Sequence, residues 1–381
     1  MPLALVSSKS PEVTQVEFFE ASNKFNVNNK HFEMDSECMN LNGRLYIVTK
    51  YLVDALLGST SWDNKTKAIF IDCQSHRIRL TLNKNTAKVD GKNTVIDSKN
   101  SNIAPIIYKN RTLVPMRFIA ENLGGEVLWD ATLKKATLTF KRFRLTNIIF
   151  LHHSCGENLI NQGNVRTLFK NYKNLYLTDK LTIQFYDHGY NDGGLTDQNG
   201  NRTGRNYNVP DDNTNPDGFA TIFLQNITNP PKNCFSQLMA HEVIVFKSCF
   251  PVSDIGSEDQ LNEYKQNYLT VRKACDKYPQ KVFIIITQPP LTKDSTSQEV
   301  AARARRWTQW LQSDDFLDGH RNLFTFDWFD LLAESNSKSG CYNCLKQRYT
   351  GDPYDSHPNE IANRETAPAF IDFIIKHAVT Y

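Results

Sequence analysis

The segment Ile148–Asn158, IIFLHHSCGEN, decides the fold of the larger part of this chain. Its first four residues are apolar and predict a short strand that is buried on both faces. Ser154 follows where the strand ends and a helix begins, which puts its hydroxyl at the carboxyl edge of a sheet, beside helix N–H groups. Two interpretations of Ser154 are open at this point: a nucleophile, or a cap of the following helix.

Three further apolar runs predict strands of the same kind, at Val243–Phe246, Val282–Thr287 and Leu323–Phe326. Between them, apolar residues recur at steps of three and four, as on one face of an amphipathic helix. These residues are Leu261, Tyr264, Tyr268, Val271 and Cys275 in one stretch and Val300, Ala304, Trp307 and Leu311 in another. Strands that alternate with helices predict an α/β fold, with a parallel sheet flanked by helices and function at the strands' carboxyl ends.

A second segment, Asp352–Asn359 (DPYDSHPN), precedes the predicted C-terminal helix and supplies what a nucleophilic serine needs. His357 can act as the base, and an aspartate can orient its imidazole. Asp355 is preferred for that task because it is nearer in sequence, Asp352 is the substitute, and a Ser–His dyad assisted by a backbone carbonyl is the third possibility. A serine, a histidine and an aspartate brought together are the parts of an acyl-transfer site.

This combination resembles the SGNH (GDSL-like) hydrolase family, in which a strand-one serine opens the domain and an aspartate–histidine block closes it. The resemblance covers residues 145–381. It implies a flavodoxin-like three-layer fold and a serine esterase, with Ser154 as the nucleophile and His357 as the general base and acid.

The chain departs from the family pattern on either side of the proposed site. His152 and His153 precede the serine in place of Gly-Asp, and Tyr354 stands where the family has an aspartate three residues before the histidine. Two adjacent imidazoles in an extended segment diverge, so packing or substrate contact is expected of them rather than metal binding.

The oxyanion donors and substrate-binding residues are predicted from their positions in the sequence relative to the expected strand ends. The expected oxyanion donors are Ser154, Gly194 and Ser248, the last in Val245–Ser253, where the family has a Gly-x-Asn-Asp block. For Ser248 the alternative is that it satisfies the strand end. The expected substrate-binding residues are His153, Tyr190 and Lys247, of which Lys247 could attract an anionic group.

The long polar loop Asp192–Gly218 contains oxygen-bearing side chains around glycines, as in Asp197–Asn201. Such side chains can hold calcium, but they also form ordinary turns, and a full EF-hand pattern is not present. We favour turns and expect no cofactor and no metal. A loop of this length beside the site is expected to shape substrate access.

An internal repeat organises the first third of the chain. Residues 50–58 (KYLVDALLG) are echoed by residues 117–125 (RFIAENLGG), and each copy is followed by a Trp-Asp pair, Trp62-Asp63 or Trp129-Asp130. The two tryptophans are 67 residues apart. Each unit predicts strands, a short helix closed by glycine and a final hairpin strand, and so a small α+β domain made of two repeats.

The stretch Asn110–Gly124 (NRTLVPMRFIAENLG), with the Trp-Asp pair after it, is similar to the copper amine oxidase N-terminal-like domain of bacterial surface and secreted proteins. The resemblance covers residues 20–142 and implies an accessory module in an extracellular setting. Only two histidines, His31 and His76, occur there, so copper chemistry is not expected. The module is expected to be a scaffold, or to bind cell wall or polysaccharide if its tryptophans are exposed rather than anchoring their hairpins.

Composition narrows the class of protein. A length of 381 residues suggests two domains, and the net charge of +3 is spread along the chain, which argues against nucleic-acid binding. No run reaches the ~20 apolar residues of a membrane span, and Met1–Val6 is too short for a signal-peptide core. The resemblances imply a secreted or cell-surface protein whose export signal lies outside this sequence. Cys341 and Cys344 form the one close cysteine pair, expected to be a local disulfide or two free thiols.

Together these features predict a bacterial serine esterase that removes a small acyl group, preferably acetyl, from a carbohydrate or another small ester substrate. Acyl transfer to another hydroxyl would use the same chemistry. The alternative from another class is a non-catalytic glycan- or cell-wall-binding surface protein with a degenerate hydrolase domain.

Overall fold

The structure is a computed structural model that describes residues 12–73, 75–177, 181–189, 194–209, 215–336 and 340–379. The chain divides into two compact units. Unit 1 comprises Met1–Leu145, Asn174–Asp179 and Ile375–Tyr381, and unit 2 comprises Thr146–Lys173 and Lys180–Ile374.

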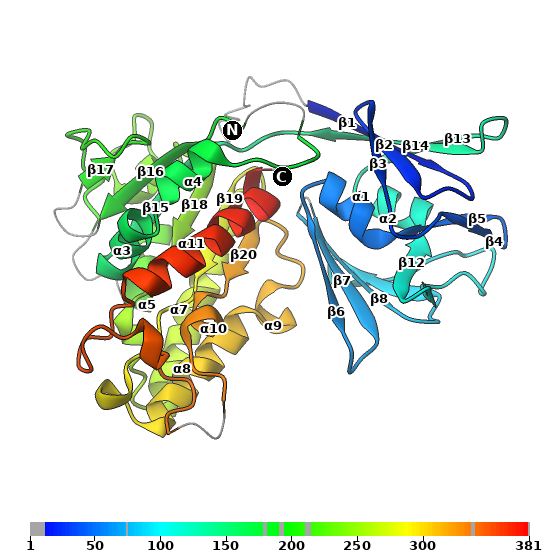
Figure 1. Cartoon of the computed structure of the whole chain (residues 1–381). Coiled ribbons are helices and arrows are strands. Elements are labelled where there is room, and N and C mark those ends of the chain that lie inside the picture. The colour runs from blue at the N-terminus through cyan, green and yellow to red at the C-terminus, as the bar shows by residue number, and fades with distance from the viewer. Residues whose placement is uncertain are drawn as a thin grey trace. The chain divides into compact units, whose positions relative to one another are not determined.

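Unit 2 is built on a six-stranded sheet with the order β17-β16-β15-β18-β19-β20 (Figure 1). The strands are β15 (Asn147–His152), β16 (Gln184–Gly189), β17 (Gly194–Thr196), β18 (Val243–Phe246), β19 (Val282–Ile286) and β20 (Leu323–Phe326). Five strands are parallel, and β17 runs antiparallel to β16. The four strands expected from apolar runs are present, whereas β16 and β17 were not predicted.

Helices cover both faces of this sheet. They are α3 (Ser154–Gln162), α4 (Val165–Asn171), α5 (Pro216–Phe223), α6 (Cys234–Leu238), α7 (Glu258–Cys275), α8 (Gln298–Leu311), α9 (Asp314–Leu317), α10 (Trp328–Leu332) and α11 (Glu360–Ile374). Successive side chains of a strand point to opposite faces. Leu151 joins the core formed with α5 to α8, while Phe150 packs against Phe370 of α11, which crosses in front of the strands in Figure 1.

Unit 1 contains the two repeats, which have the same order of elements. The first repeat is β1 (Glu12–Phe19), β2 (Lys24–Val27), β3 (Lys30–Glu33), β4 (Met39–Leu41), β5 (Arg44–Val48), α1 (Thr49–Ala55), β6 (Ser59–Asp63) and β7 (Ala68–Cys73). The second is β8 (His76–Thr81), β9 (Thr86–Val89), β10 (Lys92–Val95), β11 (Ile106–Tyr108), β12 (Arg111–Pro115), α2 (Met116–Asn122), β13 (Glu126–Asp130) and β14 (Lys135–Arg142).

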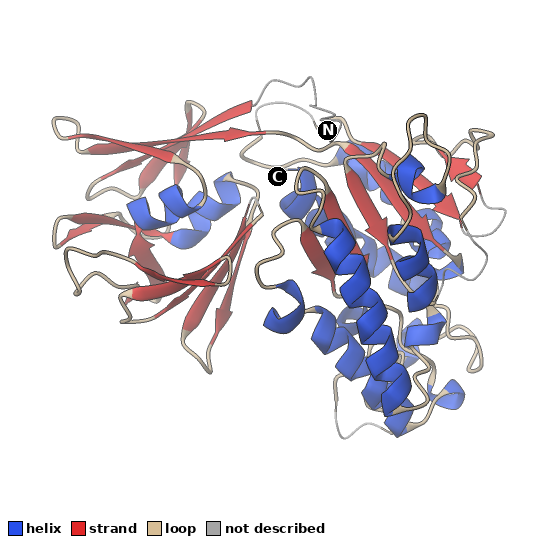
Figure 2. Cartoon of the chain, turned by 180° about the vertical axis from the view of Figure 1, so that it is seen from behind, coloured by secondary structure: helices blue, strands red, loops and turns tan. Residues whose placement is uncertain are grey.

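The repeats exchange strands with each other. The two five-stranded sheets have the orders β13-β14-β1-β2-β3 and β6-β7-β8-β9-β10, so each combines the last two strands of one repeat with the first three of the other. A third sheet, β11-β12-β5-β4, pairs Val114 with Ile47, which are equivalent positions 67 residues apart. Unit 1 is therefore pseudo-twofold symmetric about that pair. Helices α1 and α2 lie between the two five-stranded sheets (Figure 2).

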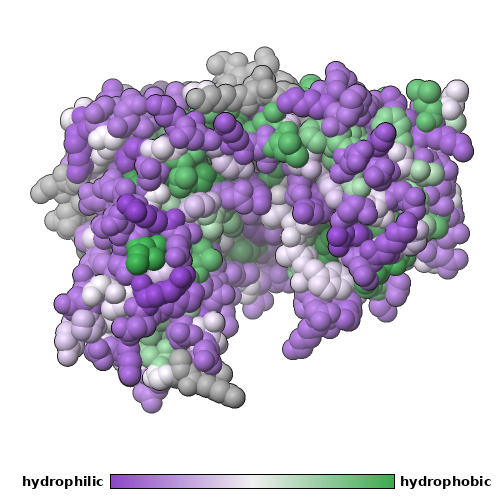
Figure 3. All heavy atoms as spheres, in the orientation of Figure 1, coloured by the Kyte–Doolittle hydropathy of each residue, from purple (hydrophilic) through white to green (hydrophobic). Residues whose placement is uncertain are grey.

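Most of the surface that faces the viewer in Figure 3 is hydrophilic, with hydrophobic residues in small, separate patches. Among the described residues, the helices are all too short or too polar to cross a lipid bilayer.

Candidate active site

Ser154 is the first residue of α3, directly after β15 and the extended residue His153 (φ −115°, ψ −167°). The N–H groups of Gly156 and Glu157 donate to the carbonyl oxygen of His153, at 2.9 and 3.0 Å. His153 is therefore the cap residue, through its backbone, and the interpretation of Ser154 as a helix cap does not hold. Gly156 permits the tight turn, because a Cβ there would lie 2.4 Å from Cβ of His152.

The hydroxyl of Ser154 contacts His357 instead. Ser154 Oγ lies 2.7 Å from Nε2 of His357, and Nδ1 of the same ring lies 2.5 Å from Oδ1 of Asp355. The order of contacts requires Nδ1–H to donate to the carboxylate, which leaves Nε2 to accept the serine proton. Hydrogen bonds from the backbone N–H and then the imidazole of His357 hold the pKa of Asp355 below its ordinary value. The carboxylate is therefore ionised at neutral pH.

The two aspartates make different contacts in the turn that carries them. Asp352 Oδ1 accepts the backbone N–H of Tyr354 at 2.8 Å, and its carbonyl oxygen accepts the N–H of Asp355 at 3.1 Å. Asp352 thus closes the turn, and Asp355 contacts the imidazole.

Contacts beyond the turn fix the position of His357. Ser356 is buried and its Oγ accepts the backbone N–H of Thr292 at 3.0 Å, while Thr292 Oγ1 donates to the carbonyl oxygen of Pro353 at 2.6 Å. The ring of Phe250 meets the imidazole edge-on, with 5.2 Å between ring centroids. These anchors come from the loops after β18 and β19, so the carboxyl edge of the sheet holds the base opposite the serine.

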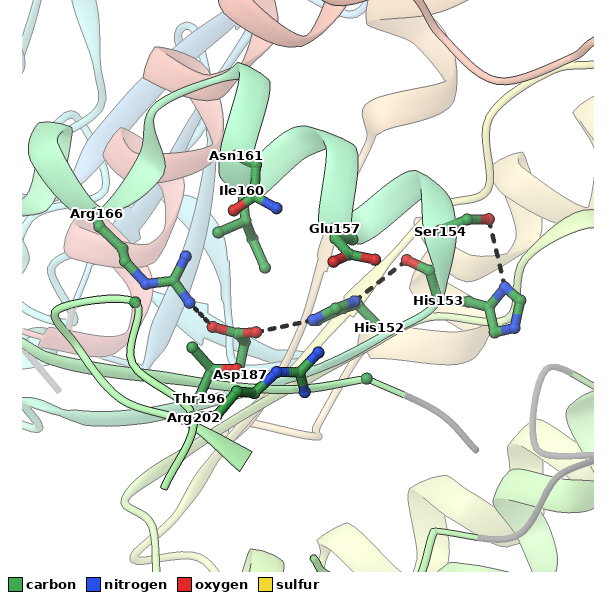
Figure 4. A pocket seen from close by; sticks show the side chains of 12 residues that line it. His152, His153, Ser154, Glu157, Ile160, Asn161, Arg166, Asp187, Thr196 and Arg202 are labelled. Carbon is green, nitrogen blue, oxygen red and sulfur yellow. Dashed lines mark hydrogen bonds and ion pairs between the residues drawn. The ribbon is translucent and has the colours of Figure 1, made fainter. Parts of the chain in front are cut away.

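A cavity of about 300 Å³ lies beside Ser154 (Figure 4). One wall is a buried polar chain: Asp187 pairs with Arg166 through one oxygen and with His152 Nε2 at 3.0 Å through the other. Burial lowers the pKa of His152 to about 4, so this imidazole is neutral at physiological pH. Neither Asp187 nor Arg166 was predicted from the sequence, although the aromatic pair before Asp187 in QFYDHG indicates a strand that could deliver a polar group.

Charged groups of both signs complete the lining of the cavity. They are Glu157 of α3 and Arg202, together with the two ends of the pair described above, Arg166 and Asp187. With two cationic and two anionic side chains, the lining carries no strong net charge.

His153 lies where the sequence placed it, at the cavity and next to the serine. Its Nδ1 is 3.4 Å from Ser154 Oγ, and the residue lines the cavity. Burial lowers the pKa of His153 below its ordinary value, and the nearby Cys249 opposes part of this effect.

Two expectations for the residues that directly follow β18 are corrected by the structure. Lys247 is fully buried, and its Nζ donates to Cys249 Sγ at 3.0 Å, so it does not line the cavity or attract a substrate. Ser248 is also buried, and its Oγ lies 2.8 Å from the hydroxyl of Tyr268, which also accepts the Ser248 N–H. Ser248 satisfies the strand end and is not aimed at the cavity.

The remaining expectations fall at the sheet edge. Gly194 pairs with Gly189 in the β16–β17 hairpin, and Gly189 rather than Gly194 lines the cavity. Gly194 therefore does not lie where an oxyanion donor was expected. Tyr190 lies outside the described residues.

The segment expected to be one long polar loop contains β17 and the start of α5, and it forms a turn around Asp197. Asp197 Oδ1 accepts the backbone N–H groups of Asn199 and Asn201 at 2.8 and 2.9 Å. Its parts at 192–193 and 210–214 lie outside the described residues. Within the described ranges no group of three or more His, Cys, Asp or Glu side chains is arranged to hold a metal ion. Cys341 and Cys344 are joined by a disulfide.

Similarity to solved structures is weak. A proposed acylhydrolase from Bacteroides fragilis is 12% identical, with 59% of this chain and 88% of that chain covered and a TM-score of 0.32. A family two carbohydrate esterase from Cellvibrio japonicus is 13% identical, with 84% and 94% covered and a TM-score of 0.30. No curated protein matches the chain. Residues 26–138, within unit 1, match the family described as the copper amine oxidase N-terminal domain.

Proposed function

We propose that unit 2 is an SGNH-type serine esterase, with a flavodoxin-like three-layer fold, that hydrolyses a small acyl ester, acetyl by preference, on a carbohydrate. The observation that carries the proposal is the continuous contact from Ser154 to His357 to Asp355, with distances of 2.7 and 2.5 Å. These are the distances at which a histidine can take a serine proton while a carboxylate orients the ring.

In the proposed reaction, Ser154 Oγ attacks the ester carbonyl carbon and its proton passes to Nε2 of His357. The tetrahedral intermediate collapses as the bond to the sugar oxygen breaks and His357 returns that proton to this oxygen, which leaves as a hydroxyl. Water then attacks the acyl-serine by the same route and releases the acid. Asp355 stabilises the imidazolium in both steps.

The oxyanion is assigned to the first turn of α3. An α-helix leaves its first N–H groups without intrahelical partners, and the positive end of its dipole favours a developing negative charge. Since Gly156 and Glu157 donate to His153, the amides of Ser154 and Cys155 are the candidate donors. His153 Nδ1, at 3.4 Å from Ser154 Oγ, is a candidate side-chain contact for the substrate.

The carbohydrate part of the proposal rests on the cavity. Its volume of about 300 Å³ suits a small acyl group and part of one sugar ring, and its lining of amide, hydroxyl and paired charged groups suits hydroxyl-rich ligands. A secreted or cell-surface location would bring the enzyme to such substrates.

The test is Ser154→Ala, assayed on 4-nitrophenyl acetate and on an acetylated xylan. We expect turnover to fall by about 10³-fold or more in the full chain, with an unchanged circular dichroism spectrum. Ser236→Ala, which removes a buried serine hydroxyl of α6 that does not line the cavity, is the control for nonspecific damage. Retained turnover in Ser154→Ala, or no turnover and no fluorophosphonate labelling in the wild-type protein, would overturn the assignment. Adding a sugar acceptor and analysing products separates hydrolysis from acyl transfer.

A further inference from the structure

The repeat in unit 1 generates two matching open grooves, one with a volume of about 810 Å³ and one of about 740 Å³. We call the first groove A and the second groove B, after Trp62 and Trp129 respectively, which line them. Both volumes are within the range typical of ligand sites.

Ten positions of each lining correspond at the 67-residue spacing of the repeat. On one side of each groove lie the start of a helix and the following strand. The equivalent pairs are Lys50 and Arg117, Thr60 and Val127, and Trp62 and Trp129.

The opposite side of each groove comes from the other repeat, because the repeats are interleaved. Ile107 and Arg111 around the β11–β12 turn face groove A, and the equivalent Asn40 and Arg44 around the β4–β5 turn face groove B. The two grooves are therefore symmetry-related, and each is formed by residues of both repeats. The residue types at equivalent positions differ between the grooves.

An ion pair recurs in both grooves. Arg111 Nε lies 2.5 Å from Oδ2 of Asp35, and Arg44 Nε lies 2.6 Å from Oδ2 of Asp97. The two aspartates follow the equivalent strands β3 and β10. Each groove thus has a guanidinium held in place by a carboxylate, a fixed arrangement that offers donors and acceptors to a hydroxyl-rich ligand.

In each Trp-Asp pair the aspartate has a structural role, whereas the tryptophan does not. Asp63 Oδ1 accepts the N–H of Lys65 at 2.8 Å, and Asp130 Oδ1 accepts the N–H of Thr132 at 2.9 Å, so each aspartate closes the hairpin turn. The tryptophans are not core anchors, since Trp62 is 40% exposed and Trp129 is 41% exposed.

We propose that unit 1 carries two repeat-related glycan sites, in which Trp62 and Trp129 each stack on a sugar ring of a β-linked polysaccharide strand. The apolar C–H face of a pyranose packs on an indole, and the equatorial hydroxyls are left to the paired arginine and the amides around the groove. The sites are separate from the Ser154 site, and the proposal stands or falls independently of the esterase assignment.

The experiment titrates the full chain by isothermal calorimetry with hexamers of N-acetylglucosamine, xylose and glucose, all β-1,4-linked. The wild-type protein is expected to bind at least one hexamer with two sites on unit 1. Trp62→Ala and Trp129→Ala should each weaken one site by about tenfold or more, and the double variant should lose both. Ser154→Ala should not change these two sites.

The matched control is Leu128→Ala, which truncates a 70% exposed side chain on the same strand as Trp129, outside the lining of groove B. It should bind as the wild-type protein does. Failure of the wild-type protein to bind any of the three hexamers, or unchanged binding by a folded Trp62→Ala/Trp129→Ala double variant, would overturn the proposal. Loss of both sites in a single variant would contradict two independent sites.

Discussion

At the scale of single residues, the role of each side chain in the site depends on which of its polar atoms already form hydrogen bonds within the protein. His357 uses Nδ1 for Asp355, so only Nε2 faces the serine, whereas both oxygens of Asp187 are taken by Arg166 and His152. Ser248 is excluded as a side-chain oxyanion donor for the same reason, because its hydroxyl is hydrogen-bonded to Tyr268.

The contrast between the two aspartates gives a first prediction. Asp355→Asn should lower kcat by about 10²- to 10⁴-fold, because an amide N–H can favour the wrong imidazole tautomer and removes the charge that stabilises the imidazolium. Asp352→Asn keeps an oxygen for the N–H of Tyr354, so kcat should change by no more than a few fold. Steady-state kinetics on 4-nitrophenyl acetate measure both. Equal losses in the two variants would contradict the assignment of Asp355.

Ser248 supplies a second prediction. Ser248→Ala should lower the free energy of unfolding by about 1 to 2 kcal/mol, because the buried Tyr268 hydroxyl loses a partner at 2.8 Å. Its kcat should stay within about twofold of wild type. A side-chain oxyanion donor would instead cost about 10²- to 10³-fold in kcat, so a loss of that size would restore the original expectation for Ser248.

At the scale of elements, α3 and α11 bring the site together, since α3 begins with Ser154 and α11 follows His357. Their close approach occurs at Gly163, where a Cβ would lie 2.7 Å from Cβ of Ala367 and 2.8 Å from the carbonyl oxygen of Asn363. A residue without a side chain thus permits this close approach of the two helices.

Gly163→Ala should therefore reduce stability and turnover together. Overpacking at this contact is expected to cost about 1 to 3 kcal/mol in the free energy of unfolding, and the shift of α3 should lower kcat more than it changes KM. Urea unfolding and steady-state kinetics measure the two effects. Gly256→Ala is the control, because a Cβ there meets only Gln260 Oε1 at an ordinary 3.5 Å. Wild-type behaviour of Gly163→Ala would show that the two helices can separate freely.

The elements that the sequence predicted are those whose burial follows from their own composition. Val243–Phe246 and Leu323–Phe326 are wholly apolar or nearly so, and they form β18 and β20. Gln184–Gly189 was missed because its buried Asp187 and His188 look like loop residues until their distant partners are known. Lys247 was misplaced for the same reason, since lysine is rarely buried without a partner and the partner, Cys249, is another side chain of the fold.

At the scale of the whole molecule, the repeat was evident from the sequence but the strand exchange was not. The 67-residue spacing gives the elements of each unit, whereas the pairing of β14 with β1 and of β7 with β8 depends on contacts between repeats. Motif order likewise suggested Ser154 with His357, and nearness in the sequence favoured Asp355, whereas the different contacts of Asp355 and Asp352 depend on the backbone of the turn.

Buried histidines in both units make the stability of the chain depend on pH. Burial lowers the pKa of His152 and His188 to about 4 and that of His241 and His377 to about 3. The unfolded chain has ordinary histidine pKa values near 6.5, so it takes up protons first as the pH falls. The stabilisation is complete above about pH 6.5 and is lost progressively down to the folded pKa values, with a slope of up to about 1.4 kcal/mol per pH unit for each histidine.

The thermal midpoint should accordingly change little between pH 8 and 7 and fall steeply between pH 6 and 4.5. His241 is a suitable probe, because its Nδ1 lies 2.7 Å from Asn147 Oδ1 and its Nε2 lies 2.8 Å from the Tyr207 hydroxyl, contacts that a neutral amide can partly replace. His241→Gln should lower the midpoint at pH 8 but reduce the drop on acidification. Differential scanning calorimetry across this range measures both quantities. A midpoint that rises between pH 6 and 4.5, or an acid-induced drop in His241→Gln as large as in the wild-type protein, would contradict the assignment of that drop to the buried neutral imidazole.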